Sequence, residues 1–79
     1  MLKIKDNVDL KELENFGLVF KPSTYKENEG YVFYTSNKFH ASYIRLSVNV
    51  LSRQIRLSSC KESVSILFDL ITAGLVEKV

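Results

Sequence analysis

The amino-acid sequence predicts an α+β domain in two layers. An antiparallel meander of three or four strands is flanked in the chain by a short N-terminal helix and a longer C-terminal helix. Residues 43–50 alternate between apolar and polar side chains, which is typical of a strand with one buried face. Residues 64–75 instead repeat apolar side chains at helical spacing. A length of 79 residues suits one domain over residues 1–79, with elements in the order αββ(β)βα.

The short helix is predicted just after Asp9. Its carboxylate can accept hydrogen bonds from free amides of the first turn, and Glu12 can reach back toward the cap. Val8 and Leu13 have the spacing of a hydrophobic staple. Gly17 is expected to end the helix in a left-handed conformation.

Strands are expected in "LVFKPSTYK", which Pro22 confines to an edge or a bulge, and in "YVFYTS". Between them "ENEG" has turn composition, and Gly30 is expected to adopt a positive φ. "NKFH" is expected to connect to the clearest strand, "SYIRLSVNV", and "QIRLSS" to return beside it. In that clearest strand the alternation predicts one inward and one outward set. The inward residues are Ile44, Leu46, Val48 and Val50, and the outward residues are Tyr43, Arg45, Ser47 and Asn49.

The long helix is predicted to begin near Ser59, a capping residue with Glu62 three positions later, and to stop at Gly74. Its predicted inward face consists of Val64, Leu67, Phe68, Ile71 and Leu75. Gly-Leu-Val follows both helices. We interpret the repeat as the same helix ending used twice: a glycine that stops the helix, which we call a glycine exit, and an apolar residue that folds back onto the last turn.

Composition argues against several classes of function. A hydrophobic fraction of 46% and a net charge of +2 exclude a disordered chain and give only a mild basic bias. Cys60 is the single cysteine, which predicts a reducing cytoplasm, and no apolar run approaches the roughly 20 residues of a membrane-spanning helix. A lone His40 and carboxylates at caps and turns give no metal site, cofactor site or catalytic group. We therefore expect no enzyme, no cofactor, no small-molecule substrate and no membrane association.

Two surfaces are candidates for binding. The last helix is apolar around more than half of its circumference, so Ile66, Leu70 and Ala73 are candidates for a protein interface, unless the first helix and the tail cover them. The outer sheet face, with Tyr43, Arg45, Arg53 and Arg56, is a candidate nucleic-acid surface. Tyr31 and Phe33 would add aromatic rings to that surface if they point outward, but their pattern fits the core equally well.

The two ends of the chain resemble a family. "LKIKDNVDLKELENFG" and "LFDLITAGLVEKV" resemble small uncharacterised proteins encoded by phages and prophages of low-GC Gram-positive bacteria. The resemblance covers roughly the first and last quarters of the chain. It implies an adaptor, regulator or inhibitor that binds a host or phage macromolecule in the cytoplasm of a bacterial host.

The function expected from the sequence is therefore a non-catalytic binding or regulatory module. It acts by protein–protein interaction through the C-terminal helix, and a homodimer is its simplest form. The alternative is a small nucleic-acid-binding protein that uses the exposed face of the sheet.

Overall fold

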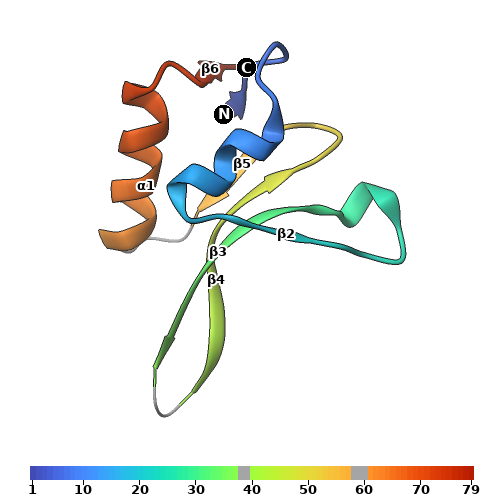
Figure 1. The fold of residues 1–79 in the computed structure, drawn as a ribbon, viewed down its shortest axis with the longest axis vertical. Helices are drawn as coiled ribbons and strands as arrows, with labels where there is room; N and C mark the ends of the chain where they lie inside the picture. The colour runs from blue at the N-terminus through green and yellow to red at the C-terminus, as the bar shows by residue number, and fades with distance from the viewer. Residues whose placement is uncertain (38–39, 58–60) are drawn as a thin grey trace.

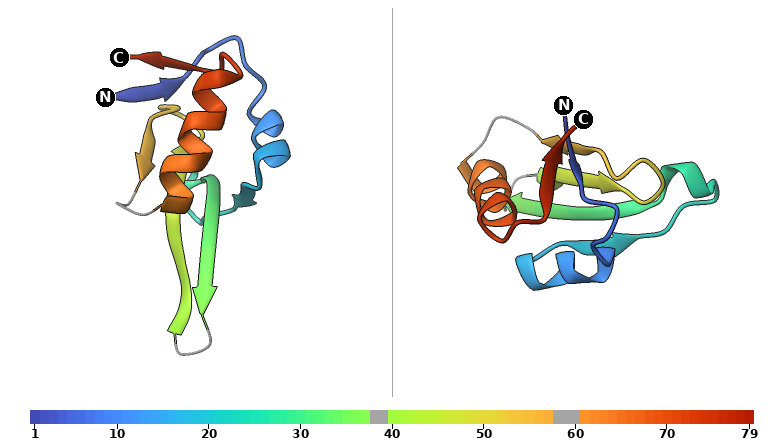
Figure 2. Two further views of the ribbon diagram at one scale, coloured as in Figure 1. Left: turned by 90° about the vertical axis from the view of Figure 1, so that its left-hand side faces the viewer. Right: turned by 90° about the horizontal axis from the view of Figure 1, so that it is seen from above.

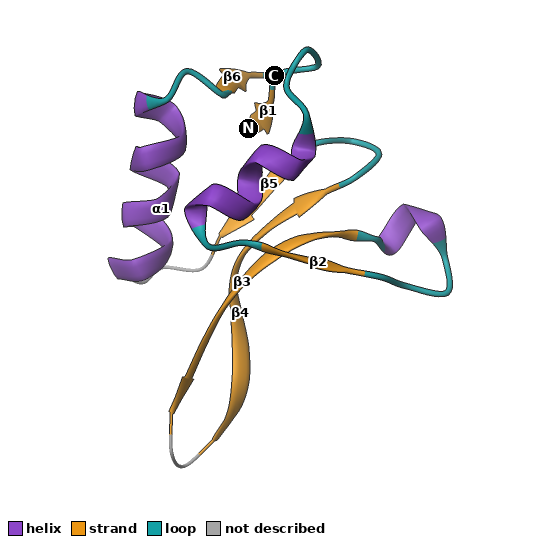
Figure 3. Ribbon diagram, viewed as in Figure 1, coloured by secondary structure: helices purple, strands orange, loops and turns teal. Residues whose placement is uncertain are grey.

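The computed structural model describes residues 1–37, 40–57 and 61–79, with the side chains of residues 1–34, 44–57 and 61–79. The predicted α+β class is confirmed (Figures 1 and 3). The elements follow the order β1 (Leu2–Ile4), η1 (Leu10–Phe16), β2 (Val19–Lys21), η2 (Lys26–Asn28), β3 (Gly30–Asn37), β4 (His40–Asn49), β5 (Ile55–Leu57), α1 (Lys61–Thr72) and β6 (Val76–Lys78). The predicted cap Ser59, Cys60, and Lys38 and Phe39 of the predicted connection lie outside the described residues.

The main sheet is an antiparallel meander in the order β2-β3-β4-β5. β2 lies at an edge and Pro22 follows it directly, as predicted, because proline cannot donate to a further strand. The expected positive φ of Gly30 is wrong. Gly30 lies inside the ladder opposite Asn49, and a Cβ atom there would come within 2.5 Å of the carbonyl oxygen of Val48. A close approach of two backbones, rather than a turn, therefore requires this glycine.

A bulge in β4 changes which side chains face the core. Phe33 pairs with Leu46, but the next residue, Tyr34, pairs with Ile44, so Arg45 is the extra residue of β4. Leu46 and Val48 are fully buried as predicted, whereas Ile44 is exposed. The inward placement of Ile44 is therefore wrong, because one extra residue moves every position beyond it to the other face.

The first predicted helix is η1, a 3₁₀ helix. The Asp9 carboxylate accepts a hydrogen bond from the amide of Lys11 at 3.0 Å, so the predicted cap is confirmed. Gly17 has a φ of 91°, which confirms the predicted left-handed exit.

Both helices end in the same backbone arrangement. At Gly17 the amides of Gly17 and Leu18 donate to the carbonyl oxygens of Glu14 and Leu13. Gly74, with a φ of 78°, repeats this pattern, since its amide and that of Leu75 donate to Ile71 and Leu70. These are Schellman motifs. The interpretation of the repeated Gly-Leu-Val as one exit used twice is confirmed.

A second, two-stranded sheet joins the ends of the chain, as Figure 1 shows. β1 pairs antiparallel with β6, with Ile4 opposite Val76, and the amide of Val79 donates to the carbonyl oxygen of Met1 at 2.9 Å. β1 was not predicted, because its three residues are too few to show a pattern.

The core lies between the main sheet, η1, α1 and β1, and η1 and α1 lie side by side against it (Figure 2). Its buried apolar residues are Ile4, Val8, Leu13, Leu18, Tyr31, Leu46, Val48, Ile55 and Leu70. Tyr31 contributes from the sheet, and burial raises the pKa of its phenol, with Glu14 and Asp9 adding smaller electrostatic effects. Phe33 packs against the same cluster, so both aromatic residues face inward. Within the described residues, no helix has the length and apolar character needed to cross a membrane.

Candidate protein-interaction surface

The orientation of α1 differs from the prediction by one residue. Leu70 and Ser63 are fully buried, and Ile66 and Leu67 are partly buried against the core. The inward face is therefore Ser63, Ile66, Leu67 and Leu70, which has the same helical spacing as the predicted face but begins one position earlier. Since one residue corresponds to a rotation of about 100°, most of the predicted inward residues face solvent instead.

Three large apolar side chains of α1 are exposed in a row. Val64 is 54% exposed, Phe68 66% and Ile71 49%. Their spacing of four and then three residues places them along one side of the helix, and we call these three residues the α1 stripe. Single exposed apolar residues are ordinary, but an adjacent row of them is a mark of an interaction surface.

The predicted interface residues Ile66, Leu70 and Ala73 are not brought together on an exposed surface. Leu70 is fully buried inside the monomer, so its assignment to an outside contact is wrong. Ile66 is half-buried and lines a shallow groove with Phe16 and Phe33, between α1 and η1. Ala73 is exposed just beyond the end of α1. Leu70 is thus covered inside the monomer, whereas part of Ile66 is left open.

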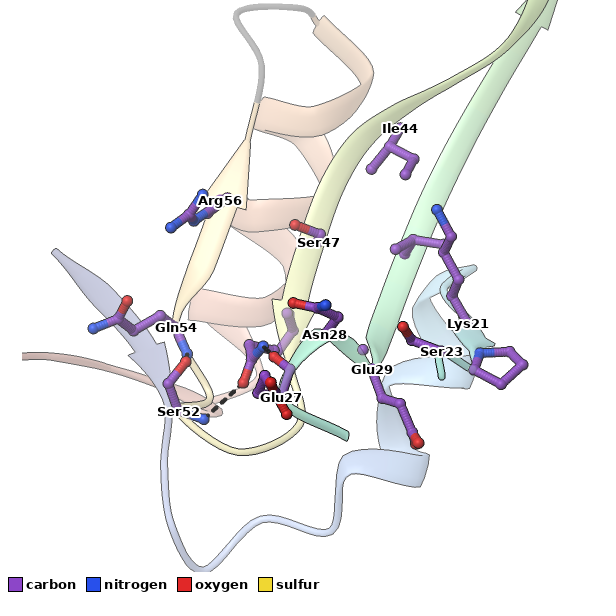
Figure 4. A pocket seen from close by; sticks show the side chains of 15 residues that line it. Lys21, Ser23, Glu27, Asn28, Glu29, Ile44, Ser47, Ser52, Gln54 and Arg56 are labelled. Carbon is purple, nitrogen blue, oxygen red and sulfur yellow. Dashed lines mark hydrogen bonds between the residues drawn. The ribbon is translucent and has the colours of Figure 1, made fainter. Parts of the chain in front are cut away.

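The outer face of the main sheet, opposite the core, carries a cavity of about 480 Å³ (Figure 4). Val32, Ile44 and Ser47 line it from the strands, and the segment between β2 and β3 closes one side. That segment is held in place because the Asn49 Nδ2 atom donates to the carbonyl oxygen of Glu27 at 2.7 Å. The lining includes charges of both signs, with Lys21 and Arg56 from the strands and Glu27 and Glu29 from the segment. This mixture favours no single class of charged ligand.

The predicted nucleic-acid residues have different environments. Arg56 is exposed on the outer face, directly opposite Ser47 in the ladder. Arg53 instead points inward, and its Nη1 atom donates to the carbonyl oxygens of Lys5 and Val8 at 2.7 Å each. Arg45 is half-buried at the bulge and already has an interaction partner, and the side chain of Tyr43 lies outside the described residues. The side chain of Arg53 is therefore held by hydrogen bonds within the fold. Among the predicted arginines whose side chains are described, Arg56 is the exposed one.

The α1 stripe is the surface that sequence reasoning missed. Residues 63–71 contain two overlapping apolar faces with the same helical spacing, so the pattern alone does not select the buried one. The small side chain of Ser63 was the available signal, because it allows the first turn of α1 to approach the core closely.

The groove, the cavity and the α1 stripe are the surfaces from which a function can be argued. No protein-family model, no curated protein and no solved structure matches this chain.

Proposed function

We propose that this chain is a non-catalytic binding module that acts by protein–protein interaction through the α1 stripe. The observation that carries the proposal is the exposure of Val64, Phe68 and Ile71 side by side on the only α-helix of the described residues. Covering such a surface is favourable by about 25 cal/mol for each Å² of apolar area removed from water. A protein partner supplies that cover more readily than a polar ligand does.

Several carboxylates have structural roles, which supports a module without catalysis. Asp9 caps η1, and Asp6 and Glu77 lie 3.1 and 3.5 Å from the ammonium group of Lys3. Hydrogen bonding to Asp6 is the main cause that raises the pKa of Lys3. These acidic groups hold turns and strand ends together rather than converging on one site.

A phage-related regulatory role in the cytoplasm of a bacterial host belongs to the same proposal. The resemblance of residues 2–17 and 67–79 to phage and prophage proteins supports it, as does the use of a single cysteine. Both resembling segments include a glycine exit and part of the core, and the second also includes Phe68 and Ile71 of the α1 stripe.

Nucleic-acid binding by the sheet has less support. Stacking of bases needs exposed aromatic rings, whereas Tyr31 and Phe33 pack against the core. Phosphate contacts need free cations, whereas Arg53 is committed to two backbone carbonyl groups. Arg56 and Lys21 alone give a weak electrostatic surface for a chain with a net charge of +2.

Capture of partners with two matched variants tests the proposed function. Phe68→Glu places a charge in the α1 stripe, and Val19→Glu places one at another exposed apolar position, in β2. Each purified chain is immobilised and exposed to its own free chain and to lysate of a low-GC Gram-positive bacterium. We expect the wild type and Val19→Glu to retain the same protein, and Phe68→Glu to lose it, because a charge cannot be buried in an apolar contact without large cost.

Circular dichroism must show that both variants keep the native fold. Retention of the same protein by Phe68→Glu would contradict the proposal, and so would a wild type that retains neither its own free chain nor any protein of the lysate.

A further inference from the structure

We infer that the partner of the α1 stripe is a second copy of this chain, bound with the two α1 helices antiparallel. The inference rests on the proposed function, since it names the protein that covers the same surface. It follows from the arrangement of side chains around α1, from the charges at the two ends of the stripe and from the area of the exposed apolar surface.

The two sides of the α1 stripe differ in polarity. On a helical wheel of about 100° per residue, the side of Phe68 that carries Val64 and Ile71 continues to the apolar Leu67. The other side of Phe68 is polar, and its residues are Lys61, Ser65, Asp69 and Thr72. When two copies pack face to face about a two-fold axis across the helices, the helices are antiparallel and like sides meet. A parallel pair would instead place each polar side against an apolar one, so the antiparallel pair is favoured.

Charges along the polar side fit the antiparallel pair as well. Lys61 and Asp69 are exposed, and neither forms an ion pair or a side-chain hydrogen bond within the described part of the chain. Along one helix they are separated by about 12 Å, so they cannot contact each other in the same copy.

The register of the pair brings these charges together across the interface. When Val64 of one copy lies beside Phe68 of the other, Lys61 comes within about 3 Å, along the axis, of the level of Asp69 in the other copy. The two-fold axis makes this contact twice, once for the Lys61 of each copy.

The exposed area suits a small, reversible dimer. The three side chains of the α1 stripe expose roughly 300 Å² of apolar surface, given the size of a phenylalanine and two β-branched residues. Because an interface is about 57% apolar on average, this area corresponds to roughly 500 Å² per copy, or roughly 1,000 Å² in total. A total near 1,000 Å² is the lower limit for a specific interface, so one symmetric contact uses the whole stripe.

Reversal of the charges at Lys61 and Asp69 distinguishes a dimer of this chain from the binding of any other partner to the α1 stripe. Sedimentation equilibrium is measured for the wild type, Phe68→Glu, Lys61→Asp, Asp69→Lys and the double variant with both charge reversals. We expect the wild type to dimerise reversibly and Phe68→Glu to remain monomeric. Each single reversal should weaken the dimer by roughly three- to tenfold at low salt, since both symmetric contacts become repulsive.

The double variant should recover the affinity of the wild type, because both contacts form again with opposite signs. A mixture of the Lys61→Asp and Asp69→Lys chains should form a heterodimer tighter than either homodimer, for the same reason. Because the two positions cannot meet within one helix, neither recovery can arise inside a single copy.

Three outcomes would overturn the inference: a monomeric wild type, a dimer that persists in Phe68→Glu, or single and double reversals with equal effects. A monomeric wild type whose stripe still retains a lysate protein, with loss in Phe68→Glu, would overturn the dimer and leave the proposed function standing. If the wild type neither self-associates nor captures a lysate protein through the α1 stripe, the inference and the proposed function are both contradicted.

Discussion

Arg53 combines a strained backbone with a side chain that joins distant parts of the fold. Among the described residues, Arg53 is the only one other than glycine that has a positive φ, and its φ is 62°. A left-handed conformation costs about 1–2 kcal/mol for a residue with a Cβ atom. The two hydrogen bonds from its guanidinium group to Lys5 and Val8 offset that cost, because bonds from a charged donor are worth about 1.5–3 kcal/mol. The β4–β5 turn is thereby tied to the segment before η1.

Two substitutions at Arg53 separate these effects. Arg53→Ala keeps the strain and removes both bonds, so we expect a loss of about 3 kcal/mol or more in the free energy of unfolding. Arg53→Gly removes the bonds but relieves the strain, and it should cost about 1 kcal/mol less than the alanine. Urea denaturation measures both variants. Equal losses would show that strain at this position contributes nothing.

At the scale of elements, the glycine exits show how a short sequence can determine local structure. In each exit two backbone amides donate to the carbonyl groups of the preceding turn, and the following leucine lies in the core or packs against it. Nothing lies within 4 Å of a Cβ atom built on Gly74. The requirement for glycine at this position is therefore one of backbone conformation, separate from packing.

Substitution of Gly74 measures that requirement directly. Gly74→Ala should lower the free energy of unfolding by about 1–2 kcal/mol, because alanine has to adopt a positive φ. Gly74→Asn should cost less, since asparagine tolerates the left-handed region better than alanine. Thermal unfolding followed by circular dichroism compares the two. An alanine variant as stable as the wild type would contradict the assignment.

The sequence was sufficient for those features that depend on residues close together in the chain. The cap at Asp9, the exits at Gly17 and Gly74 and the edge position of β2 follow from neighbouring residues, and all are observed. The buried face of α1 was not predictable, because two overlapping faces have equal spacing and only packing selects between them. The exposure of Ile44 depends on the bulge at Arg45, which no local pattern announces. Of the residues expected to contact a partner, Leu70 is therefore buried, and the exposed apolar row lies on another side of the same helix.

At the scale of the whole molecule, the two ends of the chain stabilise each other. β6 covers one edge of β1, while β1 contacts the β4–β5 turn through a hydrogen bond from the Ile4 amide to the Arg53 carbonyl group at 2.9 Å. Ile4 is fully buried in this arrangement. The small sheet thus connects the C-terminal segment after α1 with the turn of the main sheet.

Deletion of residues 76–79 tests this connection. The deletion removes the ladder to β1, the contact of Glu77 with Lys3 and part of the cover over the core, so we expect a loss of about 3 kcal/mol or more. Lys78→Ala keeps the backbone and changes an exposed side chain, and it should alter stability by no more than about 0.5 kcal/mol. The midpoint of urea denaturation compares them. Similar midpoints for the deletion and Lys78→Ala would contradict a stabilising role for β6.

Pairing of β1 with β6 also bears on the order in which the fold can form. The β2–β5 meander contains contacts between neighbours in the chain, so it can form early. β1 and β6 flank all the other elements in the chain, so their pairing closes a long loop, which is entropically costly. Until that loop closes, Ile4 lacks the strand that lies opposite it. The core is therefore incomplete until β6 pairs with β1, and this partly folded chain is the form that exposes apolar surface to chaperones.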